Sequence, residues 1–573
     1  MNTINTSPKE TLDLRSSSKL TKVQSRLLDQ IADELKPAYT DFVSEFFKGS
    51  SHSIQWQLTP LMCRNTNDCN LFKSLCKLEL VKQYCSTGKS GTIILDSPFV
   101  YQTVKNICHP KIKIVNTKGW FSRVFSIIAK NTKPFVVMMV TFSSRFIASR
   151  VIGRRTLPAE QSKITIVDTV FYNTSFREKE FYDRHFPGML EGLSGDEIDS
   201  IFYIGYYYRI NNLFDYFKKI KSSTSNILII EEFLKFRDYL YAISSFRFLF
   251  KNFKFVKFRG CDITSLFQEC YYENIVNIGT SEGLLKYRFI SRLKQRGVEL
   301  RSVLMWFENQ PNNRGMQIGL NEFYPDTPTN GYIGFFNSNN VVGVYPSAEE
   351  LTSGVLPHNI SVIGKKIVPE IKIFCPELNV MISPALRFQS LLNLGQVLEP
   401  PKFVLLVVLP IFKQESYTIL ESLYSVVRRD SNVAVKIKIH PGSNIKSIEK
   451  FVSGFGFARC ITEVPVYDAI LESSVVMTSA SSSAVEAVLL GRPTLLLSDC
   501  RGPTKNPIPP GIPKDLYAVC YDYRDIESNL RLYMDSSVGT VVLRREAASQ
   551  CRNNYIETYT PDASRELLGL DVF

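Results

Sequence analysis

VAVKIKIHPGSN (residues 433–444) and SSVVMTSASSSAVEAVLLGRPTLLLSD (residues 473–499) share one pattern: an apolar run, a polar loop and then a segment of helical composition. The β-branched runs at 433–439 and 475–478 are typical of buried strands in a parallel sheet. Gly491 and Pro493 end the second helical segment, and residues 494–498 predict a further strand. We therefore predict an α/β domain built on a parallel sheet.

Polar residues stand where two of these strands end. His440 and Pro441 follow the first run, and the triplet Ser481, Ser482 and Ser483 directly precedes the helical run 484–490. In open parallel sheets ligands bind beyond the carboxyl ends of the strands, and a helix N-terminus favours an anion. The pattern predicts a nucleotide-phosphate site without a Walker loop. The alternative is a chance strand end beside an ordinary helix cap.

A strand ending in His-Pro, followed by a strand, a serine cluster and A-x-E-A-x-x-x-G-x-P, resembles the C-terminal half of GT-B glycosyltransferases. The His-Pro and serine pairing resembles bacterial sialyl-, polysialyl- and Kdo-transferases, whose donors are CMP-sugars. In that family the histidine and serines hold the CMP phosphate, which implies donor binding by His440, Pro441, Ser481, Ser482 and Ser483. Glu486, on the following helix, is a candidate for the donor ribose or for favourable helix electrostatics.

A second resemblance covers the N-terminal half. FYDRHFPGMLEGL (181–193), FENQPNNRGMQIGL (307–320) and SPALRF (383–388) resemble a group of prokaryotic surface-carbohydrate biosynthesis proteins. The two resemblances together imply an α/β fold of the GT-B type, with two doubly wound Rossmann-like domains facing a cleft.

Composition limits the class of protein. The chain has 573 residues, of which 44% are hydrophobic, so it can bury the cores of two or three domains. Its twelve cysteines are scattered without C-x-x-C pairs, and the N-terminus has no apolar signal core, which predicts a reduced, cytoplasmic protein.

The net charge of +13 is concentrated in one segment. Residues 97–159 contain eleven Lys and Arg and no Asp or Glu, and their middle part is strongly apolar. We predict a basic helix pair at 119–155, inserted in the N-terminal domain, that contacts an anionic membrane surface through Trp120, Phe121, Arg145, Arg150, Arg154 and Arg155. The alternative is a buried helical hairpin with snorkelling arginines. No nucleic-acid-binding motif is present, so nucleic acid is not an expected partner.

The predicted organisation follows the order of the strands. We expect an N-terminal helical region (1–90), an acceptor domain (91–345), an interdomain passage (346–378), a donor domain (379–549) and a C-terminal tail (550–573). Strands of the acceptor domain are predicted at 92–95, 112–115, 164–167, 200–203, 227–230, 275–278, 303–307 and 331–336.

Glycosyl transfer needs a base for the acceptor hydroxyl and a group that stabilises the leaving phosphate. Glu308 follows the apolar run VLMWF and is our first candidate for the base; Glu231 and Glu232 follow ILII and are the next. Sialyltransferases carry an acid-acid-glycine motif, but Phe233 stands where the glycine would be. Asn309, Gln310 and Arg314 are candidates for acceptor binding, and Arg387 for a sugar carboxylate. No D-x-D stands at a strand end, so we expect no metal and no cofactor.

The predicted function is a peripheral-membrane glycosyltransferase on the inner face of the cell membrane, inverting and metal-independent. It would move a CMP-linked acidic sugar, such as Kdo or a sialic-acid relative, to a glycan or lipid-linked acceptor of surface polysaccharide. The alternatives are a UDP-hexose transferase, a CDP-polyol phosphotransferase, a nucleotide-sugar epimerase and a non-catalytic GT-B scaffold of a polysaccharide assembly complex.

Overall fold

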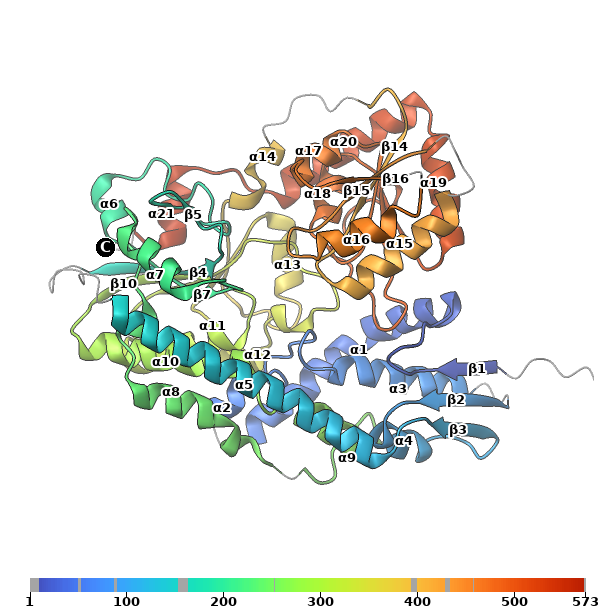
Figure 1. Cartoon of the computed structure of the whole chain (residues 1–573), viewed down its shortest axis with the longest axis horizontal. Coiled ribbons are helices and arrows are strands. Elements are labelled where there is room, and N and C mark those ends of the chain that lie inside the picture. The colour runs from blue at the N-terminus through green and yellow to red at the C-terminus, as the bar shows by residue number, and fades with distance from the viewer. Residues whose placement is uncertain are drawn as a thin grey trace, which may run out of the picture.

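The computed structural model describes residues 10–49, 53–86, 90–152, 163–251, 253–392, 399–427, 433–456 and 458–570. These residues form three parallel β-sheets, two of them six-stranded, with helices packed around them (Figure 1). The predicted α/β class with parallel sheets is confirmed.

The N-terminal lobe contains a small three-stranded parallel sheet. Its strands, in spatial order, are β1 (Glu10–Asp13), β2 (Gly91–Leu95) and β3 (Ile112–Asn116). The long helix α1 (Lys22–Gly49), with α3 (Leu71–Ser86), α4 (Pro98–Lys105) and α9 (Thr264–Tyr272), supplies most of the apolar side chains that complete its core. The predicted placement of 92–95 and 112–115 in one sheet with 164–167 is wrong, because β2 and β3 pair with β1 instead.

The second sheet has six parallel strands. Their spatial order is β13 (Val380–Ile382), β12 (Asn359–Val362), β11 (Thr329–Ile333), β10 (Leu300–Trp306), β4 (Ile164–Phe171) and β7 (Ile201–Tyr207). Because β12 and β13 extend this sheet from β11, residues 346–378 are no interdomain passage and the C-terminal half does not begin at 379.

Two predicted strands of this half are not formed. Ile227 makes a single bridge to Tyr203, and the chain then turns into the short 3-10 helix η1 (Ile230–Glu232). Residues 275–277 lead directly into helix α10 (Ile278–Gln295). The run 227–230 is buried and the run 275–278 is partly buried, and a short apolar run looks the same in sequence whether it is a strand or not.

The third sheet, in the C-terminal half, contains the predicted strands around 433–439, 475–478 and 494–498. In spatial order its strands are β16 (Ala458–Ile461), β15 (Ala434–Lys438), β14 (Val404–Val408), β17 (Val475–Thr478), β18 (Thr494–Leu497) and β19 (Tyr517–Cys520). All pairs are parallel. The helices of this half are α15 (Lys413–Val427), α16 (Ile445–Val452), α17 (Val466–Leu471), α18 (Ser483–Leu489), α19 (Tyr523–Met534) and α20 (Val538–Tyr555).

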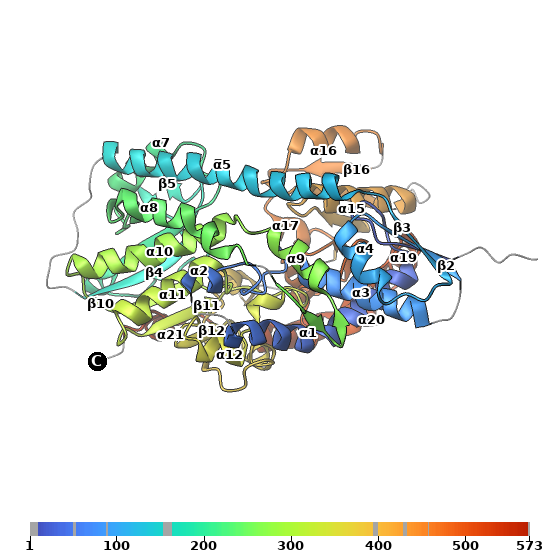
Figure 2. The ribbon, with the colours of Figure 1, turned by 90° about the horizontal axis from the view of Figure 1, so that it is seen from below.

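The basic apolar segment is one continuous helix, α5 (Trp120–Ile152), which follows β3 and precedes β4. Figure 2 shows it running along the edge of the molecule, from the three-stranded sheet to the six-stranded sheet of the N-terminal half. The predicted helix pair is wrong because the polar stretch at 130–133 does not turn. Asn131 instead fastens the helix sideways: its Nδ2 donates to the Tyr272 carbonyl at 2.7 Å and its Oδ1 accepts from Val276 N–H at 2.8 Å. By length and hydropathy α5 could also cross a membrane.

The chain crosses between the two six-stranded sheets twice, after α14 (Gln389–Leu392) and after α20. The second crossing ends in α21 (Pro561–Leu568), which returns to the N-terminal half, where Ser302 Oγ donates to the Leu568 carbonyl at 2.5 Å. The crossings are tied together: Ala385 N–H donates to the Glu557 carbonyl at 3.0 Å. Gly364 lies so close to Tyr555 that a Cβ would meet the Tyr555 carbonyl oxygen at 2.3 Å. Of the predicted tail, residues 550–555 are therefore the end of α20, and the chain that follows up to residue 570 returns to the folded N-terminal half.

Candidate functional site

A cavity with a volume of about 670 Å³ lies at the carboxyl ends of β4 and β10. Its wall includes Thr169 and Val170 from β4, Trp306 from β10, and Glu308 and Gln310 from the loop that follows β10. Lys130 and Pro134 of α5 complete one side. This is the edge at which a parallel sheet of this kind holds its ligand.

Glu308 is half-buried in the wall of this cavity. The indole Nε1–H of Trp306 donates to its Oε1 at 2.8 Å. Burial raises the pKa of the Glu308 carboxyl, and the Trp306 hydrogen bond and the positive charge of Arg387 act in the opposite direction. A carboxyl with a raised pKa beside a polar cavity is suited to accept a proton from a hydroxyl.

The next residues of the same loop divide into two groups. Gln310 lines the cavity, and its Oε1 accepts from Asn65 Nδ2 at 2.7 Å. Asn309 and Arg314 are fully buried below it: Arg314 Nε donates to Asn309 Oδ1 at 3.0 Å, and its NH2 pairs with Glu350. The prediction of acceptor binding by Asn309 and Arg314 is therefore corrected, because both side chains are used in the core.

Glu350 explains why the loop needs those two residues. Its carboxylate is fully buried and pairs with both Arg314 and Arg64, whose NH2 lies 2.7 Å away. Burial alone would raise the pKa of Glu350, but the two guanidinium groups hold it below its ordinary value. The cluster connects the N-terminal lobe to the loop that presents Glu308.

Arg387 influences groups of both the N-terminal and the C-terminal half of the protein. Its guanidinium is 5.7 Å from the centre of the Trp306 ring, and its side chain is exposed. Burial raises the pKa of Glu486, on α18 of the C-terminal half, and the charge of Arg387 lowers it, as at Glu308. The charge of one guanidinium therefore acts on a carboxyl group from each half.

His440 follows β15 and is exposed. Its Nδ1 accepts from Gly442 N–H at 3.0 Å, which leaves the proton of a neutral ring on Nε2, available for donation. Partial burial and the charges of Arg184 and Arg209, both from the N-terminal half, lower the pKa of His440. Pro441 beside it is exposed.

The predicted serine cluster stands at the start of α18. Ser481 Oγ donates to Ser483 Oγ at 3.2 Å, and Ser483 is buried. Ser482, half-buried, forms no side-chain capping bond in the part of the chain described here. Ser479, two residues before Ser481, donates to Glu415 Oε2 at 3.0 Å. His440 and these serines follow strands β15 and β17, which flank β14 on either side.

Glu231 and Glu232 are buried in η1 and do not line the cavity. Glu231 Oε1 lies 2.6 Å from Arg145 Nε, and Tyr207 OH donates to its Oε2 at 3.1 Å. The structure therefore brings Glu308 to the cavity and leaves the two other candidate bases in the core. Asp168, which does line the cavity, pairs with Lys286 Nζ at 2.5 Å.

Sequence reasoning missed His185. Its ring centre lies 4.1 Å from that of Trp306, and its Nε2 is 3.1 Å from Tyr172 OH. Burial, with Arg387 and Arg184, lowers the pKa of His185 to about 3, so the ring is neutral. Within the described chain its buried Nδ1 has no hydrogen-bond partner. The phrase FYDRHFPGMLEGL contains it, but nothing in that phrase indicates that its ring packs against Trp306.

The predicted membrane residues have different environments. Trp120 and Phe121 are 52% and 85% exposed at the start of α5. Arg145 is 3% exposed and pairs with Glu231 and Glu282, so its predicted membrane contact is wrong. Arg150 is exposed and donates to the Leu234 carbonyl at 2.7 Å. Arg154 and Arg155 lie outside the described residues. Among the described residues no group of three or more His, Cys, Asp or Glu side chains is placed to hold a metal ion.

No protein-family model and no curated protein matches the sequence. Among solved structures the chain is similar to Staphylococcus aureus MnaA in a co-structure with UDP, with 12% identity over 71% of this chain and 95% of that chain and a TM-score of 0.43. It is also similar to UDP-GlcNAc 2-epimerase from Neisseria meningitidis bound to UDP-GlcNAc, with 13% identity, 71% and 99% coverage and a TM-score of 0.42.

A third similar structure is that of S. aureus TarM with fondaparinux, alpha-GlcNAc-glycerol and UDP. There the identity is 16%, the coverage 50% of this chain and 58% of that chain, and the TM-score 0.32. At these identities and scores the similarities carry no functional argument.

Proposed function

We propose that this chain is a glycosyltransferase that moves a sugar from a nucleotide-sugar donor to a glycan or lipid-linked acceptor, with the GT-B arrangement of two facing halves. The observation that carries the proposal is Arg387, whose guanidinium lies 5.7 Å from the centre of the Trp306 ring in the N-terminal half and whose charge also acts on Glu486 of the C-terminal half. Groups from the carboxyl ends of two parallel sheets thus share one site. Such a site can hold a nucleotide on one side and an acceptor on the other.

In this proposal Glu308 is the base. It takes the proton of the acceptor hydroxyl while the hydroxyl oxygen attacks the anomeric carbon from the face opposite the leaving nucleotide. The bond from the anomeric carbon to the phosphate oxygen breaks, and its electrons stay on the phosphate. His440 donates from Nε2–H to that oxygen, and Ser481 and Ser482 stand beside it at the start of α18.

The donor that fits these groups best is a CMP-linked acidic sugar. A single phosphate needs only a few neutral or cationic donors, which His440 and the serines supply, and Arg387 is available for the sugar carboxylate. A UDP-hexose donor would carry a second phosphate, which would need further donors.

We also propose that α5 attaches the protein to the inner face of the cell membrane. The helix is about 50 Å long, and one of its faces is apolar and exposed: Phe121, Val124, Phe125, Ile128, Val136, Met139, Val140, Ile147 and Val151. An anionic bilayer is the occupant that fits, because residues 97–159 contain only cationic charges, so nothing there repels lipid phosphate. The inward-facing Arg145 and Asn131 hold the opposite side of the helix to the protein.

A nucleotide panel tests the proposed reaction. We expect CMP to raise the thermal stability of the full chain more than CDP, UDP or GDP, since a ligand at a hundred times its Kd adds about 2.7 kcal/mol to the folded state. The variant His440→Ala should lose this stabilisation, whereas Lys436→Ala, on the same strand with its Nζ on Glu472, should keep it. Stabilisation by UDP alone would exclude the CMP donor, and stabilisation by no nucleotide would favour a non-catalytic scaffold.

A further inference from the structure

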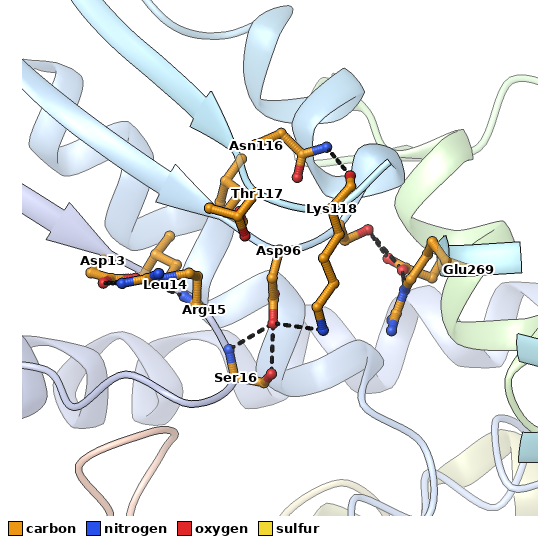
Figure 3. Close-up of polar contacts among 12 residues, drawn as sticks. Asp13, Leu14, Arg15, Ser16, Asp96, Asn116, Thr117, Lys118 and Glu269 are labelled. Atoms are coloured by element: carbon orange, nitrogen blue, oxygen red, sulfur yellow. Dashed lines mark hydrogen bonds and ion pairs between the residues drawn. The ribbon is translucent and has the colours of Figure 1, made fainter. Parts of the chain in front are cut away.

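A second polar pocket lies at the carboxyl ends of the three-stranded sheet and has a volume of about 340 Å³. Figure 3 shows three of the residues that line it: Ser16 follows β1, Asp96 follows β2 and Lys118 follows β3. Asp96 Oδ2 accepts from the Ser16 amide at 3.0 Å and from its hydroxyl at 2.6 Å. We propose that this pocket binds a phosphate monoester, and that the phosphate belongs to the acceptor.

The charges of the pocket favour an anion. Five cationic side chains line it against three carboxylates, which leaves a surplus of two positive charges. The cations are Lys73, Lys77, Lys118, Arg123 and Lys130, and the carboxylates are Asp96, Glu269 and Glu273. A phosphate monoester carries about −1.5 to −2 charges near neutral pH, which would balance that surplus.

Two of the three carboxylates, Glu269 and Glu273, form ion pairs with cations on one side of the pocket. Arg123 pairs with Glu269 and Glu273, and Lys130 Nζ lies 2.6 Å from Glu273 Oε1. Ser97 Oγ caps α4 and donates to Glu269 at 2.7 Å, so this helix N-terminus is occupied by the protein itself. The surplus positive charge is therefore on the other side, where Lys73, Lys77 and Lys118 stand against the single carboxylate of Asp96.

Lys77 is the central group of that side. Its Nζ donates to the Leu14 carbonyl at 3.1 Å, and among the described residues neither Lys77 nor Lys73 forms an ion pair. An ammonium group has three donors, so the described residues leave two of them for a ligand. Burial lowers the pKa of Lys77 to about 8, because a cation that is removed from water without a neighbouring anion is destabilised. Lys118, by contrast, is half exposed, 3.9 Å from Asp96, and can reach a ligand at the pocket mouth.

The position of the pocket indicates whose phosphate it holds. Asn70, Lys130 and Glu273 line both this pocket and the 670 Å³ cavity that contains Glu308, so the two spaces are neighbours. Arg123 and Ser126 line it from α5. A molecule with its phosphate here would have its next group near the proposed base. The assignment to the acceptor rests on the proposed function, but phosphate binding itself does not.

The test compares two lysines of one helix in the full chain. Inorganic phosphate is titrated calorimetrically into the wild type, Lys77→Met and Lys82→Met; Lys82 pairs with Glu79 outside the pocket. We expect Lys77→Met to lose roughly tenfold or more in phosphate affinity, the size of one charged hydrogen bond, and Lys82→Met to be unchanged. Lys118→Gln, at an exposed position that folding does not require, should lose several-fold.

Two arms identify the source of the phosphate. Phosphatidylcholine vesicles containing phosphatidic acid, a monoester, are compared with vesicles of equal phosphatidylglycerol content, a diester. A preference for phosphatidic acid that Lys118→Gln abolishes supports a lipid phosphate; phosphate binding without that preference supports a soluble acceptor.

Absence of phosphate binding in the wild type, or equal affinity in the Lys77→Met, Lys118→Gln and Lys82→Met proteins, would overturn the proposal. Thermal shifts with CMP in the same variants separate the two proposals. If a variant loses phosphate binding but keeps a normal thermal shift with CMP, the result bears only on the phosphate pocket. If no nucleotide shifts the melting temperature, the result contradicts only the proposed transferase function.

Discussion

Replacement of Arg145 by methionine tests whether α5 is attached to the protein core by this residue. The Arg145 side chain is 3% exposed, and its partners Glu231 and Glu282 are 0% and 7% exposed. Methionine keeps most of the apolar volume but removes the charge, so Glu231 retains only the Tyr207 hydroxyl among its described partners. Loss of one partner from a buried ion pair costs about 3–5 kcal/mol, and we expect a loss near the lower end because Glu282 lines the cavity and can be hydrated.

The assay is urea unfolding followed by tryptophan fluorescence. All three tryptophans, Trp56, Trp120 and Trp306, lie in the N-terminal half, so the signal reports the part of the protein that contains Arg145. Arg150→Met is the matched control: its guanidinium is exposed and bonded to one carbonyl, and we expect a loss of about 1 kcal/mol or less.

A loss of less than about 1 kcal/mol in the Arg145→Met protein, together with weaker vesicle binding, would refute the reasoning and restore Arg145 as a membrane contact.

Four further outcomes are expected. His440→Ala should reduce turnover by roughly a hundredfold or more with an unchanged fold, measured as steady-state sugar transfer. Glu308→Gln should bind CMP normally and lower kcat by on the order of a hundredfold to ten-thousandfold, and normal turnover would remove it as the base. The double variant Phe121→Ser/Phe125→Ser, at positions 85% and 69% exposed, should lose about 2–4 kcal/mol of partitioning into anionic vesicles, on the order of 30- to 900-fold in a flotation assay. Phosphate affinity should fall as the pH rises above about 8, because Lys77 loses its proton there. The other charged groups that act on Lys77 are Lys73, Asp96, Asp499 and Asp13. A calorimetric affinity that stays constant from pH 7 to about 9 would contradict this prediction.

The C-terminal sheet could be predicted from sequence because its strands are short apolar runs, of which the central β14, β17 and β18 are buried on both faces. Residues 433–439 and 475–478 alternate with helical segments that end at Gly or Pro, and this local pattern is sufficient to define a parallel sheet. The partners of β2 could not be predicted, because strand pairing depends on tertiary contacts. β1 is the four-residue ETLD in a polar N-terminal region, so sequence gives little reason to expect a strand there.

For the candidate site, sequence reasoning succeeded where a residue follows a strand directly. Glu308 after β10 and His440 after β15 lie at the edges expected for them. It failed for Arg145 and Arg314, whose charges suggested exposure. Each is buried and pairs with a carboxylate from another part of the chain: Arg145 with Glu231, and Arg314 with Glu350. No local sequence pattern encodes those pairs.

The paired crossings between the halves also have a mechanical consequence. Two chain segments tied to each other, by the Ala385 amide on the Glu557 carbonyl and by the close approach of Gly364 to Tyr555, confine any relative rotation of the halves to an axis passing near that tie. Displacement in a rotation grows with distance from the axis. Arg387 is two residues from Ala385, so its guanidinium stays nearly in place while His440, carried on the C-terminal half, swings towards or away from Glu308. If the proposed reaction requires the two halves to open, that motion would change the distance between His440 and Glu308 without moving Arg387.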